Sequence, residues 1–243
     1  MAAPPSAYRP IDRQISEDFK AYWETVDRSR AENATRQKEL LRVAHKLAVC
    51  FVSLARETAD LEEHLGIFLR ELASDAVHLV NSIATGDARA SRFYLRSAIE
   101  NFWRHYYFRD HPIEYGWIRD RDGYYLELKE LREHCAWLKA FGGCLKPSLD
   151  ALSGRFAELS KFVHSTTISS LALKTTLQEI KLGTAETKDI QIQVVETLRT
   201  TLLLCMSAES KAFAAMHFQA QDFLRRALDA DRRRLYQESL GNG

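Results

Sequence analysis

The sequence predicts an all-α protein, a bundle of about seven helices with a long C-terminal helical segment. Apolar residues recur at helical spacing along most of the 243 residues, and strand-like alternation is nearly absent. Proline and glycine number only 5 and 10, so few turns interrupt the chain. A hydrophobic content of 46% is enough to build a core without metal ions or disulfides.

The chain is expected to divide into a flexible N-terminal arm, residues 1–12, and one helical-bundle domain, residues 13–240. Six helices are predicted over about 13–33, 35–58, 60–85, 88–110, 124–141 and 148–166. A further segment, residues 185–239, contains neither proline nor glycine, so we expect one helix or a helical pair there.

The first and third helices show the signals on which these ranges depend. Phe19, Tyr22, Trp23 and Val26 recur at helical spacing, which predicts an amphipathic first helix. Gly86 follows the third helix in the sequence Thr-Gly-Asp, where a left-handed cap suits glycine. A short turn between the third and fourth helices is therefore expected.

Charge and cysteine usage exclude several classes of protein. The chain has 34 Lys and Arg against 33 Asp and Glu, so no global field attracts nucleic acid or anionic lipid. No stretch approaches the roughly 20 apolar residues of a membrane span. We therefore expect a cytoplasmic protein that binds no membrane, metal or cofactor. The cysteines lack ligand or disulfide-framework spacing and are expected to be reduced: Cys50, Cys135, Cys144 and Cys205.

Two pairs of polar residues lie four positions apart on predicted helices. Arg96 and Glu100 meet on one side of their helix, and Ser160 and His164 do so on theirs. If the two helices pack together, a guanidinium, a carboxylate, a hydroxyl and an imidazole converge, and His164 becomes a candidate general base. The alternative is structural: Glu100 holds Arg96 and the pairs fix helix packing without chemistry.

The same two helices carry a family resemblance. Arg96-Ser97-Ala98-Ile99-Glu100 and Leu159-Ser160-Lys161-Phe162-Val163-His164-Ser165 resemble the motifs of a family of uncharacterised bacterial helical proteins in the HEPN-like superfamily. The resemblance covers roughly residues 60–170. It implies a bacterial helical bundle in a superfamily rich in toxin and phage-defence ribonucleases, which commonly act as dimers.

The HEPN ribonuclease signature joins an arginine to a histidine a few residues later, and Arg104 and His111 match it with six residues between them. RNA cleavage needs a histidine to move a proton at the 2′-hydroxyl and an arginine to stabilise the charged phosphorane. Pro112 biases His111 away from helical geometry. The alternative is a solvated helix end whose cations complement the helix dipole.

Basic and aromatic residues are densest around the end of the fourth predicted helix. Such a composition suits stacking and neutralisation of single-stranded nucleic acid, and it equally suits a protein interface. The residues are Arg104, Arg109, Arg119, Arg121, Trp103, Tyr106, Tyr107 and Trp117.

Two functions follow as expectations. The first is a HEPN-like effector of bacterial stress or phage defence that cuts RNA without metal, acting as a dimer. Its predicted catalytic residues are Arg96, Glu100, Arg104, His111 and His164, and its predicted substrate-binding residues are Trp103, Tyr107, Arg109 and Ser160. The second is a non-catalytic sensor, adaptor or inhibitor, in which the C-terminal segment binds a partner protein and the polar pairs only fix the bundle.

Overall fold

The computed structural model describes residues 10–58, 61–164, 168, 171, 173–174 and 179–241. Within these residues it contains eleven α-helices, two short 3-10 helices and no strand, which confirms the all-α class and corrects the predicted count of about seven. The α-helices are α1 (Pro10–Arg36), α2 (Lys38–Arg56), α3 (Glu63–Thr85), α4 (Ala88–Asp110), α5 (Pro112–Asp120), α6 (Leu128–Trp137), α7 (Lys146–Val163), α8 (Thr184–Ala208), α9 (Ser210–Ala215), α10 (Phe218–Ala227) and α11 (Ala230–Gly241).

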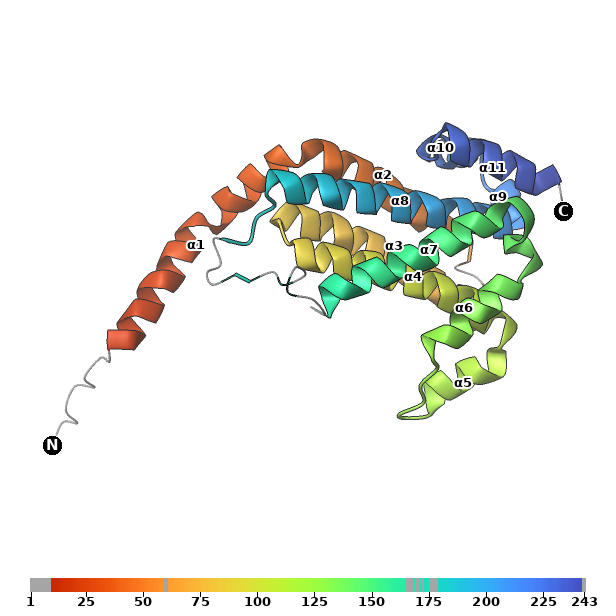
Figure 1. Cartoon of the computed structure of the whole chain (residues 1–243), viewed down its shortest axis with the longest axis horizontal. Helices are drawn as coiled ribbons and strands as arrows, with labels where there is room; N and C mark the ends of the chain where they lie inside the picture. Colours follow the sequence, from red (N-terminus) through yellow and green to blue (C-terminus); the bar gives the residue numbers. More distant parts are fainter. Residues whose placement is uncertain are drawn as a thin grey trace.

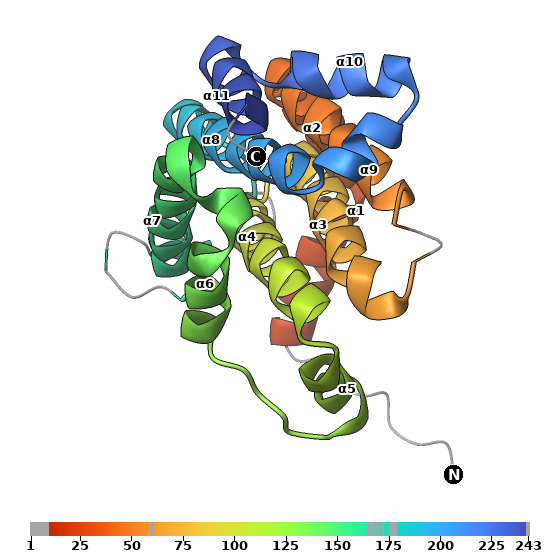
Figure 2. The same ribbon diagram turned by 90° about the vertical axis from the view of Figure 1, so that its right-hand side faces the viewer.

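Helix α4 is the centre of the bundle. It packs against α3, α5, α6, α7 and α8 (Figure 2), and its large aromatic residues Phe102, Trp103 and Tyr106 are fully buried. Helix α2 covers α3, and α8 lies against both α2 and α7. Since α4 contributes side chains to nearly every interface, its polar residues are placed between helices rather than on a free surface.

Helix α1 is anchored at its C-terminal end and projects from the bundle at its N-terminal end (Figure 1). The amide of Asn33, which is 2% exposed, donates hydrogen bonds of 2.9 Å to the carbonyls of Ile83 and Ala84 and so caps the end of α3. By contrast, residues 11–21 are all exposed. Helix α1 begins at Pro10, so the last three residues of the predicted flexible arm are helical; residues 1–9 lie outside the described part of the chain.

The prediction of one helix or a helical pair over residues 185–239 is wrong. Residues 185–239 form α8, α9, α10 and α11, because the backbone is extended at Met216 and Leu228 although neither proline nor glycine is present. The second break is fixed by Asp229, whose carboxylate accepts a 2.9 Å hydrogen bond from the backbone N–H of Arg232. Helices α10 and α11 fold back over α2 and α8 instead of extending the bundle.

The segment after α4 also differs from its prediction. The loop expected around Arg119 is largely helical, as α5, and the helix expected over 124–141 is reduced to α6 and a 3-10 turn, Lys139–Phe141. These elements form a lobe at one end of α4 (Figure 2). Among the described residues, no helix combines the length and the apolar character that a membrane crossing requires.

Candidate functional site

The two polar pairs of α4 and α7 do come together, although only in part. The guanidinium of Arg96 donates a 3.1 Å hydrogen bond to Ser160 Oγ and lies 3.3 Å from Glu100. Glu100 also holds Arg104 at 2.5 Å, so one carboxylate lies between two arginines spaced a helical turn to either side. The side chains of Arg96 and Glu100 are each 16% exposed.

The side chains of this cluster connect α4 to its neighbouring helices. The guanidinium of Arg96 stacks over the ring of Phe156, 4.6 Å from its centroid, and that of Arg104 lies over Phe68. Phe156 belongs to α7 and Phe68 to α3, so the two arginines join α4 to both neighbours. Both guanidinium groups share the single carboxylate of Glu100, so a phosphate bound by either one would compete with an internal contact, although the three side chains together keep one net positive charge.

His164 does not join the cluster. It follows the last residue of α7, is exposed, and donates its backbone N–H to the carbonyl of Ser160. No contact between its ring and Arg96 or Glu100 is recorded among the described residues. The predicted convergence of four groups is therefore a convergence of three, with the imidazole left out.

Arg104 and His111 each contact other residues: Arg104 contacts Glu100 and Phe68, and His111 contacts Tyr107. Nδ1 of His111 donates a 2.8 Å hydrogen bond to the carbonyl of Tyr107, and its ring stacks on that of Tyr107 with centroids 4.1 Å apart. His134 packs edge-on against His111 at 4.8 Å. The bond from Nδ1 fixes the tautomer of a neutral His111, so that Nε2 carries the lone pair and is the nitrogen available as a base.

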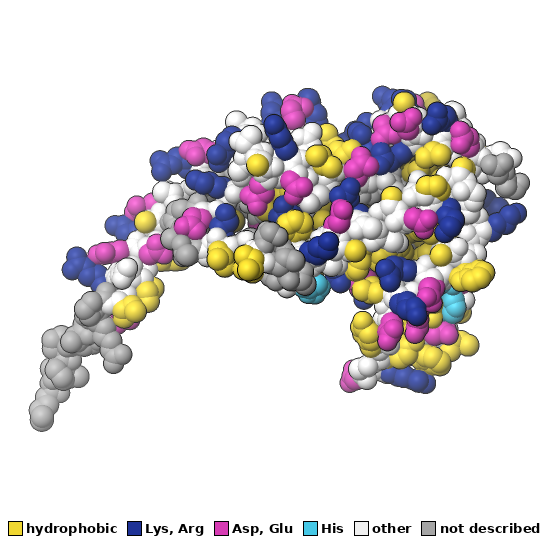
Figure 3. Space-filling model, viewed as in Figure 1, with side chains coloured by type: hydrophobic (Ala, Val, Ile, Leu, Met, Phe, Trp, Pro, Cys, Tyr) yellow, Lys and Arg dark blue, Asp and Glu magenta, His cyan; other side chains and the backbone are white. Residues whose placement is uncertain are grey.

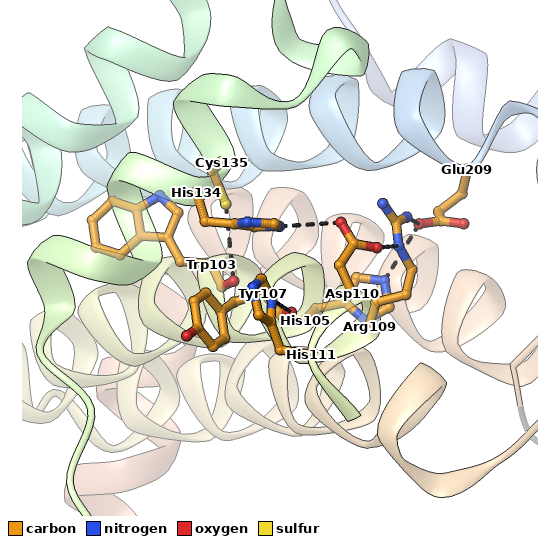
Figure 4. Close-up of polar contacts among 9 residues, drawn as sticks. All are labelled: Trp103, His105, Tyr107, Arg109, Asp110, His111, His134, Cys135 and Glu209. Carbon is orange, nitrogen blue, oxygen red and sulfur yellow. Dashed lines mark hydrogen bonds and ion pairs between the residues drawn. The ribbon is translucent and has the colours of Figure 1, made fainter. Parts of the chain in front are cut away.

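A polar network extends from His111 and His134 toward α9 (Figure 4). Nε2 of His134 lies 3.1 Å from Asp110, Asp110 lies 3.3 Å from Arg109, and Arg109 donates a 2.9 Å hydrogen bond to Glu209. Burial and the neighbouring His111 lower the pKa of His134 below its usual value, and the Asp110 carboxylate opposes them. The network connects α6 through the end of α4 to the start of α9.

Glu209 is the inner end of this network and was not predicted from the sequence. Burial raises its pKa, but His105, 3.4 Å away, and Arg109 outweigh burial and lower the pKa overall. His105 is 1% exposed and Tyr106 is fully buried beside Cys205. Glu209 lies 100 residues beyond Arg109, and no spacing rule in a single sequence connects them.

The predicted substrate-binding residues are mostly internal. Trp103 is fully buried and packs against Phe156, so its indole is not accessible to a ligand in this structure, and Tyr107 is only 9% exposed. Of the remaining basic and aromatic residues, Arg119 pairs with Asp120 and Arg121 lies over Trp117. Of the surface expected to stack on single-stranded nucleic acid, Trp103, Tyr106 and Tyr107 are therefore buried, whereas Arg119 and Arg121 are exposed.

Neither a group of metal ligands nor a pocket points to a second functional site among the described residues. The described residues contain no group of three or more His, Cys, Asp or Glu side chains placed to hold a metal ion, and the four cysteines are free thiols. A pocket of about 480 Å³ lies between α1, the α3–α4 turn and residues 180–181. None of the predicted site residues lines it.

The fold and site define an all-α protein built around one helix, with an internal polar network and a projecting N-terminal helix. The chain matches no protein-family model, no curated protein and no solved structure.

Proposed function

We propose that the chain is a non-catalytic helical module that acts by protein–protein association through α1. The observation that carries the proposal is an apolar stripe on α1, which consists of Ile11, Ile15, Phe19 and Trp23. These side chains are between 60% and 68% exposed. They lie four residues apart and so share one side of the helix.

The stripe indicates an interface because its four large apolar side chains are adjacent to one another on the helix surface. Single exposed apolar residues are normal on a protein surface, whereas a contiguous row of large ones marks an interaction site. Figure 3 shows hydrophobic side chains along α1 among charges of both signs. An amphipathic helix that offers residues at such spacing is a common way to dock into an apolar groove.

The internal contacts of the predicted catalytic and substrate-binding arginines also favour this function. Arg96 and Arg104 share Glu100, and Arg109 is held by Glu209, so each arginine already has a carboxylate partner. Such networks fix helix packing without requiring chemistry. The C-terminal segment, which the sequence suggested as the interface, is folded onto the bundle, and α1 takes that part in the proposal.

Site-specific photocrosslinking in the native cell tests the proposal. A photoreactive residue replaces Phe19, and a matched one replaces Trp137, an aromatic residue of α6 that is 87% exposed. We expect a discrete protein adduct from position 19 and none from position 137. Equal, diffuse labelling from both positions, or no adduct from position 19, would refute an interface on α1.

A second candidate function is the HEPN-like effector that cuts RNA in bacterial stress or phage defence. The fixed tautomer of His111, with Nε2 free of any recorded partner among the described residues, favours it, because a general base needs such a nitrogen. A dimer would have to supply the phosphate clamp, since Arg104 is paired with Glu100. Intact cellular RNA after induction of wild type, His111→Ala and Arg104→Ala alike, with folded protein present, would count against this function.

A further inference from the structure

The apolar stripe of α1 continues a surface that is already used inside the chain. Toward the C-terminal end of α1, Tyr22 and Val26 are half-buried and line the pocket of about 480 Å³ beside Ile180. Farther along, Asn33 is buried against α3. One side of α1 therefore passes from the buried polar residue Asn33, through Val26 and Tyr22 at the pocket, to the exposed apolar stripe.

The exposed part of α1 has little in its own chain to hold it in a helix. Its recorded side-chain contacts are local, such as the ion pair of 2.8 Å between Arg13 and Glu17 and the hydrogen bond from Ser16 Oγ to the Asp12 carbonyl. Each local pair adds only about 0.2–0.5 kcal/mol. Helices in proteins are stabilised mainly by packing of an amphipathic face, so the exposed part of α1 would gain stability by packing against a second molecule.

We propose, building on the proposed function, that this second molecule is another copy of the chain, bound through an antiparallel α1–α1 pair. With the midpoint near residue 21, Phe19 lies against Trp23 of the second copy, and Ile15 lies against its Val26. An antiparallel pair is symmetric, so the same contacts form twice about a two-fold axis. The stripe of one copy can therefore pack against the same stripe of the second copy.

Charge selects the antiparallel direction. Asp12 and Arg30 are 18 residues apart, which is five turns of an α-helix, so both lie on the same side of α1. The antiparallel register sets Asp12 of each copy opposite Arg30 of the other. A parallel pair would instead set Asp12 against Asp12 and Arg30 against Arg30.

The pocket is the place where the end of the second helix is received. In this register residues 11–16 of one copy lie opposite residues 26–31 of the other, which include Val26, Ser29 and Arg30 of the pocket lining. Ile11 and Ile15 then meet Val26 and Ile180, while Asp12 approaches Arg30. No ion pair of Arg30 with another described residue is recorded, so this cation is available to the second copy.

The size of the contact predicts a weak dimer. Residues 11–31 overlap over about 30 Å, and a helix is about 10–12 Å across. Such a contact falls below the roughly 800 Å² per partner of a typical stable interface, so we expect dissociation in the micromolar range.

Sedimentation velocity of the full chain tests the pair and its direction with complementary charge reversals. Asp12→Arg alone and Arg30→Asp alone should each weaken dimerisation about tenfold, because two exposed contacts turn from attractive to repulsive. An equimolar mixture of the two variants should regain dimers. In the mixed dimer the cation introduced at position 12 faces the carboxylate introduced at position 30, and the native pair of Asp12 and Arg30 forms the other contact. Trp137→Glu on α6 serves as the control and should dimerise like wild type, and thermal melting checks that every variant is folded.

The outcomes separate the two proposals. Dimers that the mixture restores support the antiparallel pair. Dimers that ignore both charge reversals overturn it. A monomer at every concentration, combined with an adduct of another protein from position 19, overturns the second copy as occupant while the proposed function stands. A monomer without any adduct overturns both.

Discussion

Replacing Asp75 with asparagine should stabilise the protein at neutral pH. Asp75 lies on α3, is 5% exposed, and faces α4, where the amide of Asn101 donates a 2.8 Å hydrogen bond to its carboxylate. Burial raises the pKa of Asp75 to about 6, and hydrogen bonds from Ser97 and Asn101 only partly oppose burial. The folded protein therefore ionises this group at a cost that the unfolded chain does not have.

The magnitude follows from the pKa. The rise of the Asp75 pKa from 3.8 to about 6 corresponds to about 3 kcal/mol in the free energy of unfolding, since a shift of one pKa unit is worth about 1.4 kcal/mol. The folded state binds the proton more tightly, so the contribution of Asp75 is fully present below about pH 3.8 and is lost as pH rises through about 6. Asparagine keeps an oxygen that accepts the hydrogen bond from Asn101, and it carries no charge. Asp75→Asn should therefore raise the free energy of unfolding by up to about 3 kcal/mol above pH 7 and by little below pH 4.

Urea unfolding at both pH values measures this difference. Asp122→Asn is the matched control, because Asp122 is an exposed carboxylate in the turn after α5 and should change stability by less than about 0.5 kcal/mol. If Asp75→Asn destabilises the protein equally at both pH values, the carboxylate is a net stabilising partner in the fold and the argument from burial is wrong.

Three further substitutions test other parts of the structure by the same unfolding assay. Glu209→Gln should cost about 1–3 kcal/mol, because Arg109 loses its charged acceptor in a partly buried site; an unchanged midpoint would mean that solvent replaces it. Gly86→Ala should cost about 1–2 kcal/mol, since φ is +84° and a Cβ would lie 2.9 Å from Lys181 Cα; stabilisation would contradict the left-handed cap. Ser160→Ala should cost about 1 kcal/mol without altering cellular RNA, and intact folding with a lost RNA phenotype would instead support the predicted substrate-binding role of this serine.

The central helices could be predicted from the sequence because their ends carry strong local signals. Helix α4 has the predicted bounds, Ala88–Asp110. Gly86 adopts the left-handed conformation, the Asp87 carboxylate accepts a 2.9 Å hydrogen bond from the backbone N–H of Ala90, and Pro112 begins α5. Each signal acts within a few residues, so it is visible in one sequence.

The C-terminal breaks could not be predicted because tertiary contacts fix them. Leu228 is 3% exposed with an extended backbone, and Arg232 reaches back to Glu196 at 2.6 Å. Burial of Leu228 and this ion pair hold α11 across α8, and neither depends on a proline or glycine. Without such a residue, the sequence pattern favours an unbroken helix.

The contacts of the candidate site were predictable directly where two residues share a helix, and the contact of Arg96 with Ser160 was predictable only on the condition that α4 and α7 pack together. The spacing of Arg96 and Glu100 correctly predicts their contact, because residues four apart on a helix are neighbours. The partners Ser160 and Glu209 come from other elements, and only packing brings them to α4. The amphipathic character of α1 was likewise visible in the sequence, but periodicity does not tell which surface covers an apolar face.

Hydrogen exchange at the backbone amides of residues 11–23 tests most directly whether α1 associates with a second copy. We predict that protection of these amides rises with protein concentration across the micromolar range, while amides in the middle of α4 exchange slowly at every concentration. Phe19→Glu should abolish the dependence on concentration, because it places a charge within the apolar stripe. Fast exchange of residues 11–23 that is the same at all concentrations in both proteins would contradict the account.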